Sequence, residues 1–327
     1  MSTGIFDRCD SKLMRSLHSC TPFNHMLDFS ESTCHWQIYA GGAKHIAKRI
    51  YTLDRVYEGD ALTVLNLMFY HDALNKFTAR HWKQRTADML GCARDDCIIK
   101  AVLQSGNTSK VKLPKPYIKV LEVIAKICDN ILDHNDPARG SLEYIEHLNH
   151  LERRLTHVKQ LVDQEDEIET LGQPCQDDSV PKIAELYRLA GLIYLNRAGK
   201  GFPSNKSNVR LLVEAGLEIV ASLDACGRAF PVVILGCEAR SDSDRLVILD
   251  LLRRTKSCRK IGFIAGAQKF IETWWAQDDL HAEEEFDYVR KFDAIMSLSK
   301  YRPSFAVSLM GGSFLPTTHK VKSHDAE

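Results

Sequence analysis

Apolar side chains recur at every third or fourth position along most of this chain, which is the spacing of one face of an α-helix. Asp136-Pro137 is expected to cap a long helix that carries apolar residues through positions 142–158. Strand signals are weak, because residues 232–235 are apolar but have no alternating partner run. We therefore predict an all-α fold, an irregular multi-helix bundle. Helices are expected over residues 60–80, after Pro116, after Pro137, and near residues 208–223, 230–240, 243–255, 259–276 and 286–295.

Two segments in the second half are apolar almost without interruption. Residues 181–195 are apolar nearly all the way round a helix, which predicts a buried helix that Pro181 opens. Residues 230–239 form a second buried segment, and this one carries the carboxylate of Glu238 into an apolar run. A buried carboxylate needs a partner, and Arg245 follows seven positions later in the sequence. We predict that Glu238 and Arg245 form a structural ion pair.

Charge and hydropathy restrict the classes of partner. Lys plus Arg and Asp plus Glu number 43 each, so the formal net charge is zero. This balance argues against a surface for nucleic acid or anionic membrane that covers the whole chain. No apolar run is long enough to cross a bilayer, and the first residues lack a signal-peptide pattern. We expect a protein of the nucleus or cytoplasm with no membrane partner.

The ten cysteines are scattered, and no two have the C-x2-C spacing typical of structural zinc sites. Cys92 and Cys97 form the closest pair, with Asp95 and Asp96 between them. Thiols of an intracellular protein are mostly small apolar side chains of the core. We therefore predict no metal site and no cofactor.

A polar cluster follows the second apolar segment and consists of Glu238, Asp242, Asp244 and Arg245. Carboxylates beside an arginine suit proton transfer or the binding of a polar ligand. The structural alternative is favoured: Glu238 satisfies a buried partner, and Asp242 or Asp244 caps the next helix at its positive end. No residue is assigned a catalytic role.

Other candidate groups also have structural explanations. Three histidines, His147, His150 and His157, share part of one helix surface without the H-E-x-x-H spacing of zinc enzymes. We expect them on the surface. The densest basic cluster is expected to be a solvated helix end, with an import signal or a phosphate contact as the alternative; it comprises Arg253, Arg254, Lys256, Arg259 and Lys260. Core positions are expected, with a ligand cavity as the alternative, for Met68, Phe69, Phe270 and Trp274.

The order of several motifs resembles a known family. Residues 35–43 read HWQIYAGGA, residues 142–158 form the long helix, and Trp274-Trp275 precedes a closing segment at residues 302–306. Together with the two buried segments, this series is similar to the C-terminal regulatory domain of fungal zinc-cluster transcription factors. That family binds DNA through a separate cysteine-rich module, whose C-x2-C pairs this sequence does not contain. The resemblance divides the chain into a divergent N-terminal segment (1–34), a helical regulatory domain (35–306) and a polar tail (307–327). A breaker segment at residues 172–180 is a candidate linker, but buried helices on both sides favour one continuous domain.

The resemblance implies a role in fungal gene regulation, in a secondary-metabolite or nutrient pathway. Without zinc ligands or net positive charge, the chain would act through a protein partner or an apolar small-molecule effector, with no direct DNA binding and with a homodimer left open. The alternatives are an enzyme of fungal secondary metabolism that performs acid/base chemistry on an apolar substrate, and a truncated product. A non-enzyme is favoured. A closed core around Glu238 would weaken the enzyme hypothesis, and an open pocket with convergent polar groups would strengthen it.

Overall fold

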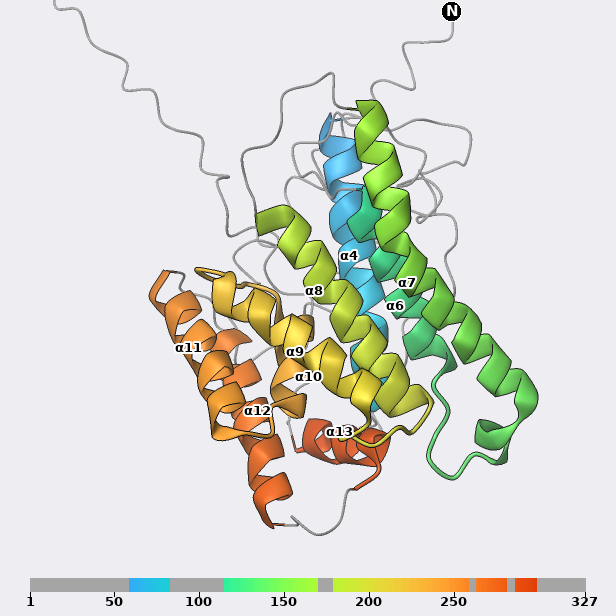
Figure 1. The fold of residues 1–327 in the computed structure, drawn as a ribbon, viewed down its shortest axis with the longest axis vertical. Helices are drawn as coiled ribbons and strands as arrows, with labels where there is room; N and C mark the ends of the chain where they lie inside the picture. Colours follow the sequence, from blue (N-terminus) through green and yellow to red (C-terminus); the bar gives the residue numbers. More distant parts are fainter. Residues whose placement is uncertain (1–58, 83–114, 170–178, 259–262, 281–285, 299–327) are drawn as a thin grey trace, which may run out of the picture.

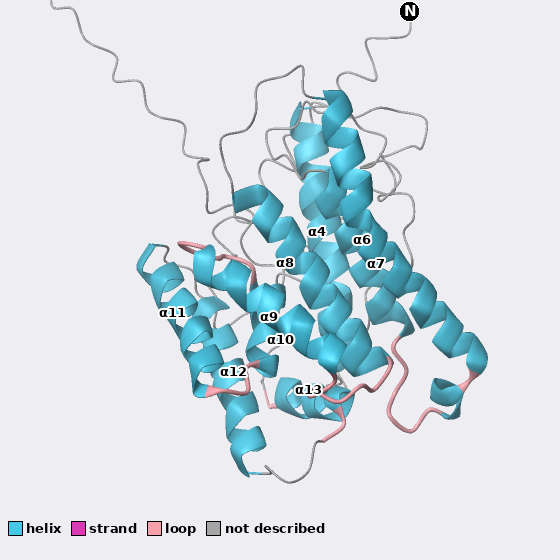
Figure 2. Ribbon diagram, viewed as in Figure 1, coloured by secondary structure: helices cyan, strands magenta, loops and turns pink. Residues whose placement is uncertain are grey.

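A computed structural model of the chain describes residues 59–82, 115–169, 179–258, 263–280 and 286–298. Every regular element in these ranges is a helix, which confirms the predicted all-α fold (Figures 1 and 2). The apolar segment at residues 232–235 lies inside a helix. None of the described helices is both long and apolar enough to cross a membrane.

The first group of helices packs side by side along the long axis of the molecule (Figure 1). It consists of α4 (Gly59–His81), α6 (Lys115–Asn130), α7 (Leu142–Glu169) and α8 (Ser179–Tyr194). Helix α6 contacts α4, α7 and α8. Its apolar positions recur at helical spacing, and Pro116 lies in its first turn, where a missing N–H costs no hydrogen bond.

The second group wraps around one short buried helix. It consists of α9 (Ser207–Ser222), α10 (Ala229–Glu238), α11 (Asp242–Cys258), α12 (Phe263–Leu280) and α13 (Tyr288–Ser297). All residues of α10 are buried, because α8, α9, α11 and α12 contact it. Helix α13 then returns to α4, so the last described helix packs against the first.

One apolar core joins the two groups. Phe77 of α4 lies at its centre, with its ring 5.1 Å from the rings of both Tyr194 and Phe230 and 5.5 Å from that of Phe292. These rings meet edge to face, an arrangement that aromatic pairs favour over flat stacking. The side chains come from α4, α8, α10 and α13, so four helices are fixed at one point.

The start of α7 differs from the prediction. Asp136 caps a separate short 3-10 helix (Pro137–Gly140), accepting a hydrogen bond from the backbone N–H of Ala138. The long helix begins at Leu142, and the hydroxyl of Ser141 just before it accepts a hydrogen bond from the N–H of Tyr144. Leu142 and Ile145 are 72% and 43% exposed, so the buried side chains of this helix begin with Tyr144 and Leu148.

Three smaller predictions have mixed outcomes. Helix α8 begins at Ser179, with Pro181 inside its first turn, where proline is tolerated. The helix expected from residue 259 is described from Phe263 onward, and α13 starts after Phe286, which is 47% exposed. Some predictions concern positions outside the described residues: the segments 35–43 and 302–306, residues 172–178 of the candidate linker, Cys92, Cys97, Arg259 and Lys260. The domain limits stay predictions.

Candidate functional site

A buried ion pair lies where α8, α10 and α13 meet. The Nε of Arg197 donates to Oε1 of Glu238 over 2.8 Å, and the two side chains are 4% and 1% exposed. The guanidinium also donates through Nη1 to the carbonyl of Phe202 and lies 4.8 Å from the centre of the Tyr288 ring. The carboxylate, a backbone carbonyl and an aromatic face therefore replace the water that Arg197 loses on burial.

The backbone that carries Arg197 is a π turn. Residues Leu195–Gly199 follow α8 directly, and the N–H of Lys200 donates to the carbonyl of Leu195 over 3.0 Å, five positions back. Gly201 then ends the turn with a φ of 66°, which favours glycine. Single π turns inside helices are rare and frequently mark functional sites. This π turn contacts α7 and α13 and contains two buried polar residues, Asn196 and Arg197. Arg197 links it to α10 through Glu238.

The predicted partner of Glu238 needs correction. Arg245 makes a two-pronged contact with Asp279 of α12, at 2.7 and 2.9 Å, and its guanidinium lies 5.2 Å from the Trp275 ring. Arg245 lies in the first turn of α11, whereas the carboxylate of Glu238 is buried against Arg197. Glu238 is buried and paired, but the arginine that holds it is 41 positions earlier in the sequence.

The two aspartates of the same cluster lie at the start of α11. The hydroxyl of Ser241 accepts from the N–H of Asp244 over 3.1 Å, and the carboxylate of Asp244 accepts from the N–H of Ser241 over 3.4 Å. This reciprocal arrangement is a capping box. The prediction that Asp242 or Asp244 caps the helix is corrected in part: Ser241 is the cap residue, and Asp244 completes the box. Because Glu238 is closed in and Asp244 serves the helix end, the cluster does not form an open acid/base site.

A second buried network was missed by the sequence analysis. His81, at the end of α4, contacts Oδ1 of Asp293 through Nδ1 over 2.8 Å and the hydroxyl of Tyr194 through Nε2 over 2.7 Å. Burial raises the pKa of Tyr194 well above its usual value, so the hydroxyl stays protonated. A histidine four positions after Phe77, on the buried stripe of a helix, was the signal for it. The chain Asp293–His81–Tyr194 ties α13 to α4 and α8.

Tyrosine hydroxyls form a third buried cluster. The hydroxyls of Tyr70 and Tyr187 are 3.0 Å apart, and the rings of Tyr117 and Tyr187 lie edge to face at 5.0 Å. Burial raises the pKa values of Tyr117 and Tyr187 well above their usual range. The guanidinium of Arg228 lies 5.6 Å from the centre of the Tyr70 ring, a distance at which a cation is attracted to an aromatic face. These groups connect α4, α6, α8 and the start of α10.

The aromatic residues for which a cavity was the alternative pack into or against the core. Phe69 is 3% exposed and Trp274 is 1% exposed. Met68 and Phe270 are partly buried and pack against the same core. Their structural interpretation is supported by these contacts.

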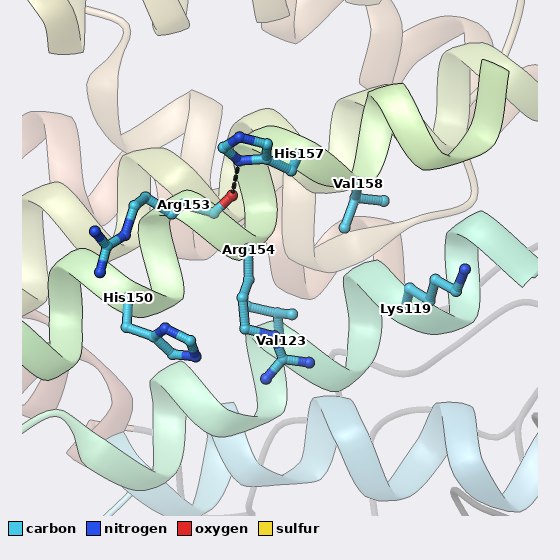
Figure 3. A pocket seen from close by; sticks show the side chains of 7 residues that line it. All are labelled: Lys119, Val123, His150, Arg153, Arg154, His157 and Val158. Carbon is cyan, nitrogen blue, oxygen red and sulfur yellow. Dashed lines mark hydrogen bonds between the residues drawn. The ribbon is translucent and has the colours of Figure 1, made fainter. Parts of the chain in front are cut away.

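An open hollow lies on the outer face of α6 and α7 (Figure 3). Its volume is about 270 Å³, and it is lined by Lys119, Val123, His150, Arg153, Arg154, His157 and Val158. All three histidines of α7 are exposed as expected, and two of them, His150 and His157, belong to this hollow. Within the described residues, no three His, Cys, Asp or Glu side chains are grouped as a metal site. The hollow is thus a cationic surface with a small apolar floor, and periodicity alone did not single it out.

The chain was compared with known proteins. The family described as "Fungal specific transcription factor domain" matches residues 25–305. A relative described as "Transcription factor iacI", from Pestalotiopsis fici, is 25% identical over 281 residues, which cover 84% of this chain and 68% of the relative. No solved structure matches.

Proposed function

This chain belongs to the fungal specific transcription factor domain family, and we propose that it works in the nucleus by contacting a protein of the transcription machinery or a DNA-binding regulator. The match confirms the resemblance inferred from its motifs and makes the chain a regulator of transcription. The observation that carries the proposal is this match over residues 25–305 of a chain whose sequence has no C-x2-C pair and no net charge.

The structure supports a partner contact in two ways. Two buried polar pairs hold helices of the interior together, Arg197 with Glu238 and His81 with Asp293. Cationic side chains, by contrast, gather on the open face of α6 and α7. Another molecule can reach the exposed side chains of that face, such as Arg153, while the buried pairs hold the helices that present it.

Three finer expectations belong to the proposal. We propose that an apolar small molecule modulates the regulator, that it serves a secondary-metabolite or nutrient pathway, and that it can form a homodimer. They rest on the resemblance, and each can be tested separately by a thermal-shift screen, by transcript profiling of a deletion strain and by light scattering.

A tethering assay tests the proposed function. We would fuse the full chain to an unrelated DNA-binding module and measure a reporter gene under the matching operator in fungal cells. The expected result is a reporter output that differs from that of the DNA-binding module alone, together with nuclear localisation of a fluorescently tagged chain. Equal output from the fusion and the bare module, at equal protein level, would contradict the proposal.

A further inference from the structure

We propose that the hollow between α6 and α7 binds an acidic segment of a partner protein in which carboxylates alternate with apolar side chains. This inference rests on the proposed function and names the chemistry of the partner. The hollow lies on the outer face, and its cations come from two neighbouring helices (Figure 3).

Helical spacing explains how the basic groups come together. Lys119 and Val123 are four positions apart on α6 and therefore share a face. On α7, the positions 150, 153, 154, 157 and 158 follow the spacing of a single helical stripe. Because α6 and α7 pack against each other, the two stripes border one hollow, with Val123 and Val158 buried at its floor.

One carboxylate beside the hollow serves two cations. Glu122 accepts from both Lys126, over 2.6 Å, and Arg154, over 3.2 Å, so two cations share one anion. Burial alone raises the pKa of Glu122, but these two cations lower it below its usual value. Arg153 and His150 are exposed, and the described part of the chain provides neither with a carboxylate partner. An anionic ligand would therefore meet the exposed charge of Arg153 next to an arginine, Arg154, that shares its carboxylate with Lys126.

Some of these side chains are already held in place. Glu122 orients the guanidinium of Arg154, and the Nδ1–H of His157 donates to the carbonyl of Arg153 over 2.7 Å. A neutral His157 then presents its other ring nitrogen outward as an acceptor, and a charged one presents a donor. Preorganised groups lose less conformational entropy when a ligand binds. Arg154 and His157 would therefore lose less conformational entropy on binding than freely rotating side chains would.

Shape decides between a protein segment and a small molecule. Pockets for small ligands usually have volumes of about 300–1,000 Å³ and enclose most of the ligand. This hollow has about 270 Å³ and is bordered by the exposed side chains His150, Arg153 and His157. It can take one apolar side chain of a longer ligand, while flanking carboxylates reach the cations. An acidic and apolar peptide has this composition.

Nucleic acid fits the hollow less well. Duplex DNA is bound through many phosphate contacts along its length. Here the cations are confined to short stretches of two helices, and the formal net charge of the chain is zero. The test below treats DNA as a competing ligand whose success would overturn the proposal.

Fluorescence anisotropy with the full chain is the test. The probe is a fluorescein-labelled peptide in which Asp and Glu alternate with Leu and Phe, and the matched probe replaces every Asp and Glu with Asn and Gln. We expect only the acidic peptide to bind, with an affinity that falls as salt is added. Arg153→Glu is expected to weaken binding about tenfold, and Arg153→Lys to retain most of it. Arg253→Glu, an exposed charge reversal on α11, is the matched control and should bind as the parent does.

Each outcome is decisive once circular dichroism shows that the variants fold. Unchanged acidic-peptide binding by Arg153→Glu, equal binding of both peptides, or tighter binding of a DNA duplex lost in the same variant would each overturn the proposal. The tethering assay is run on the same variant. A reporter output that survives Arg153→Glu while peptide binding is lost contradicts this site as the route but leaves the regulator function standing.

Discussion

At the scale of single residues, the pairing of Glu238 with Arg197 dominates the interior. We predict that Glu238→Ala lowers the free energy of unfolding by about 3–5 kcal/mol, because it leaves a buried guanidinium without its anion. Replacing both partners, with Glu238→Leu and Arg197→Met, should recover part of this loss. Urea unfolding followed by circular dichroism measures both effects.

The surface pair of Arg245 and Asp279 provides the control. Asp279 is 59% exposed on its side chain, and exposed ion pairs contribute little to stability. Asp279→Ala should therefore leave the urea midpoint nearly unchanged. If Glu238→Ala also left it unchanged while abolishing reporter output in the tethering assay, the carboxylate would be a functional group and not a structural one.

His71 of α4 makes stability depend on pH. It is 5% exposed, and burial lowers its pKa to about 4 from 6.5. The unfolded chain therefore binds a proton more readily than the folded chain, so stability rises with pH across this range. The contribution is fully present above pH 6.5 and is lost as the pH falls from 6.5 toward 4, by up to about 3 kcal/mol.

Melting temperatures across this pH range check the prediction. His71→Gln removes the titrating group, and the variant should lose less stability than the parent between pH 6.5 and 4. Parallel curves for the two proteins would show that His71 does not titrate as its burial requires.

For Glu238, the sequence predicted the burial of the side chain but not the identity of its partner. A carboxylate within an apolar run must be buried and partnered, and Glu238 is. Its partner could not be identified from nearness in the sequence, because Arg197 reaches it from a different helix. A π turn, which brings Arg197 to that position, has no sequence signature comparable to a cap or a proline.

At the scale of elements, close approach of α10 and α12 depends on one missing side chain. A Cβ at Gly236 would lie 2.7 Å from the Cδ1 atom of Ile271 and 2.9 Å from its Cγ1 atom. We predict that Gly236→Ala is destabilising, because overpacking costs about 1–3 kcal/mol and outweighs the gain of up to about 1 kcal/mol in helix propensity. Adding Ile271→Val should relieve part of the strain.

Gly266 of α12 is the matched comparison, since a Cβ there meets nothing within 4 Å. Gly266→Ala should raise the melting temperature through helix propensity alone. Thermal unfolding of the three variants separates packing from propensity. A Gly236→Ala protein that is as stable as Gly266→Ala would contradict the close approach.

Element boundaries were predictable where local chemistry sets them. Pro116 lies in the first turn of α6, and Asp244 completes the cap of α11, as their residue types indicate. The expectation that Asp136-Pro137 starts the long helix was wrong. Asp136 starts a short 3-10 helix, and Ser141 precedes the long helix. Both solutions satisfy the backbone N–H groups, and tertiary packing chooses between them.

At the scale of the whole molecule, zero net charge bears on DNA binding. We predict that the purified chain alone shows no sequence-dependent shift of duplex DNA at physiological salt, because little phosphate attraction supports binding. A gel-shift series with operator and scrambled duplexes measures this. A specific shift at sub-micromolar protein would contradict the prediction and would assign the chain its own DNA contact.

The helical class was predictable for a whole-molecule reason. Amphipathic spacing persists across nearly all described segments, and helices that bury one face each must pack together. The arrangement was not predictable in the same way. The packing of α13 on α4 joins segments more than two hundred positions apart, for example through His81 and Asp293, whose separation is 212, and local pattern says nothing about such distant contacts.

The π turn at Leu195–Gly199 predicts which sequence changes should occur together in related proteins. Its hydrogen bond spans five positions where an ordinary helix spans four, so the turn accommodates one residue more than α-helical geometry would. Deleting a single residue before Arg197 would restore the ordinary helix and move Arg197 by one position, about 100° around the helix axis. Arg197 would then leave Glu238. In related sequences, we therefore expect the loss of that residue to occur together with a replacement of Glu238.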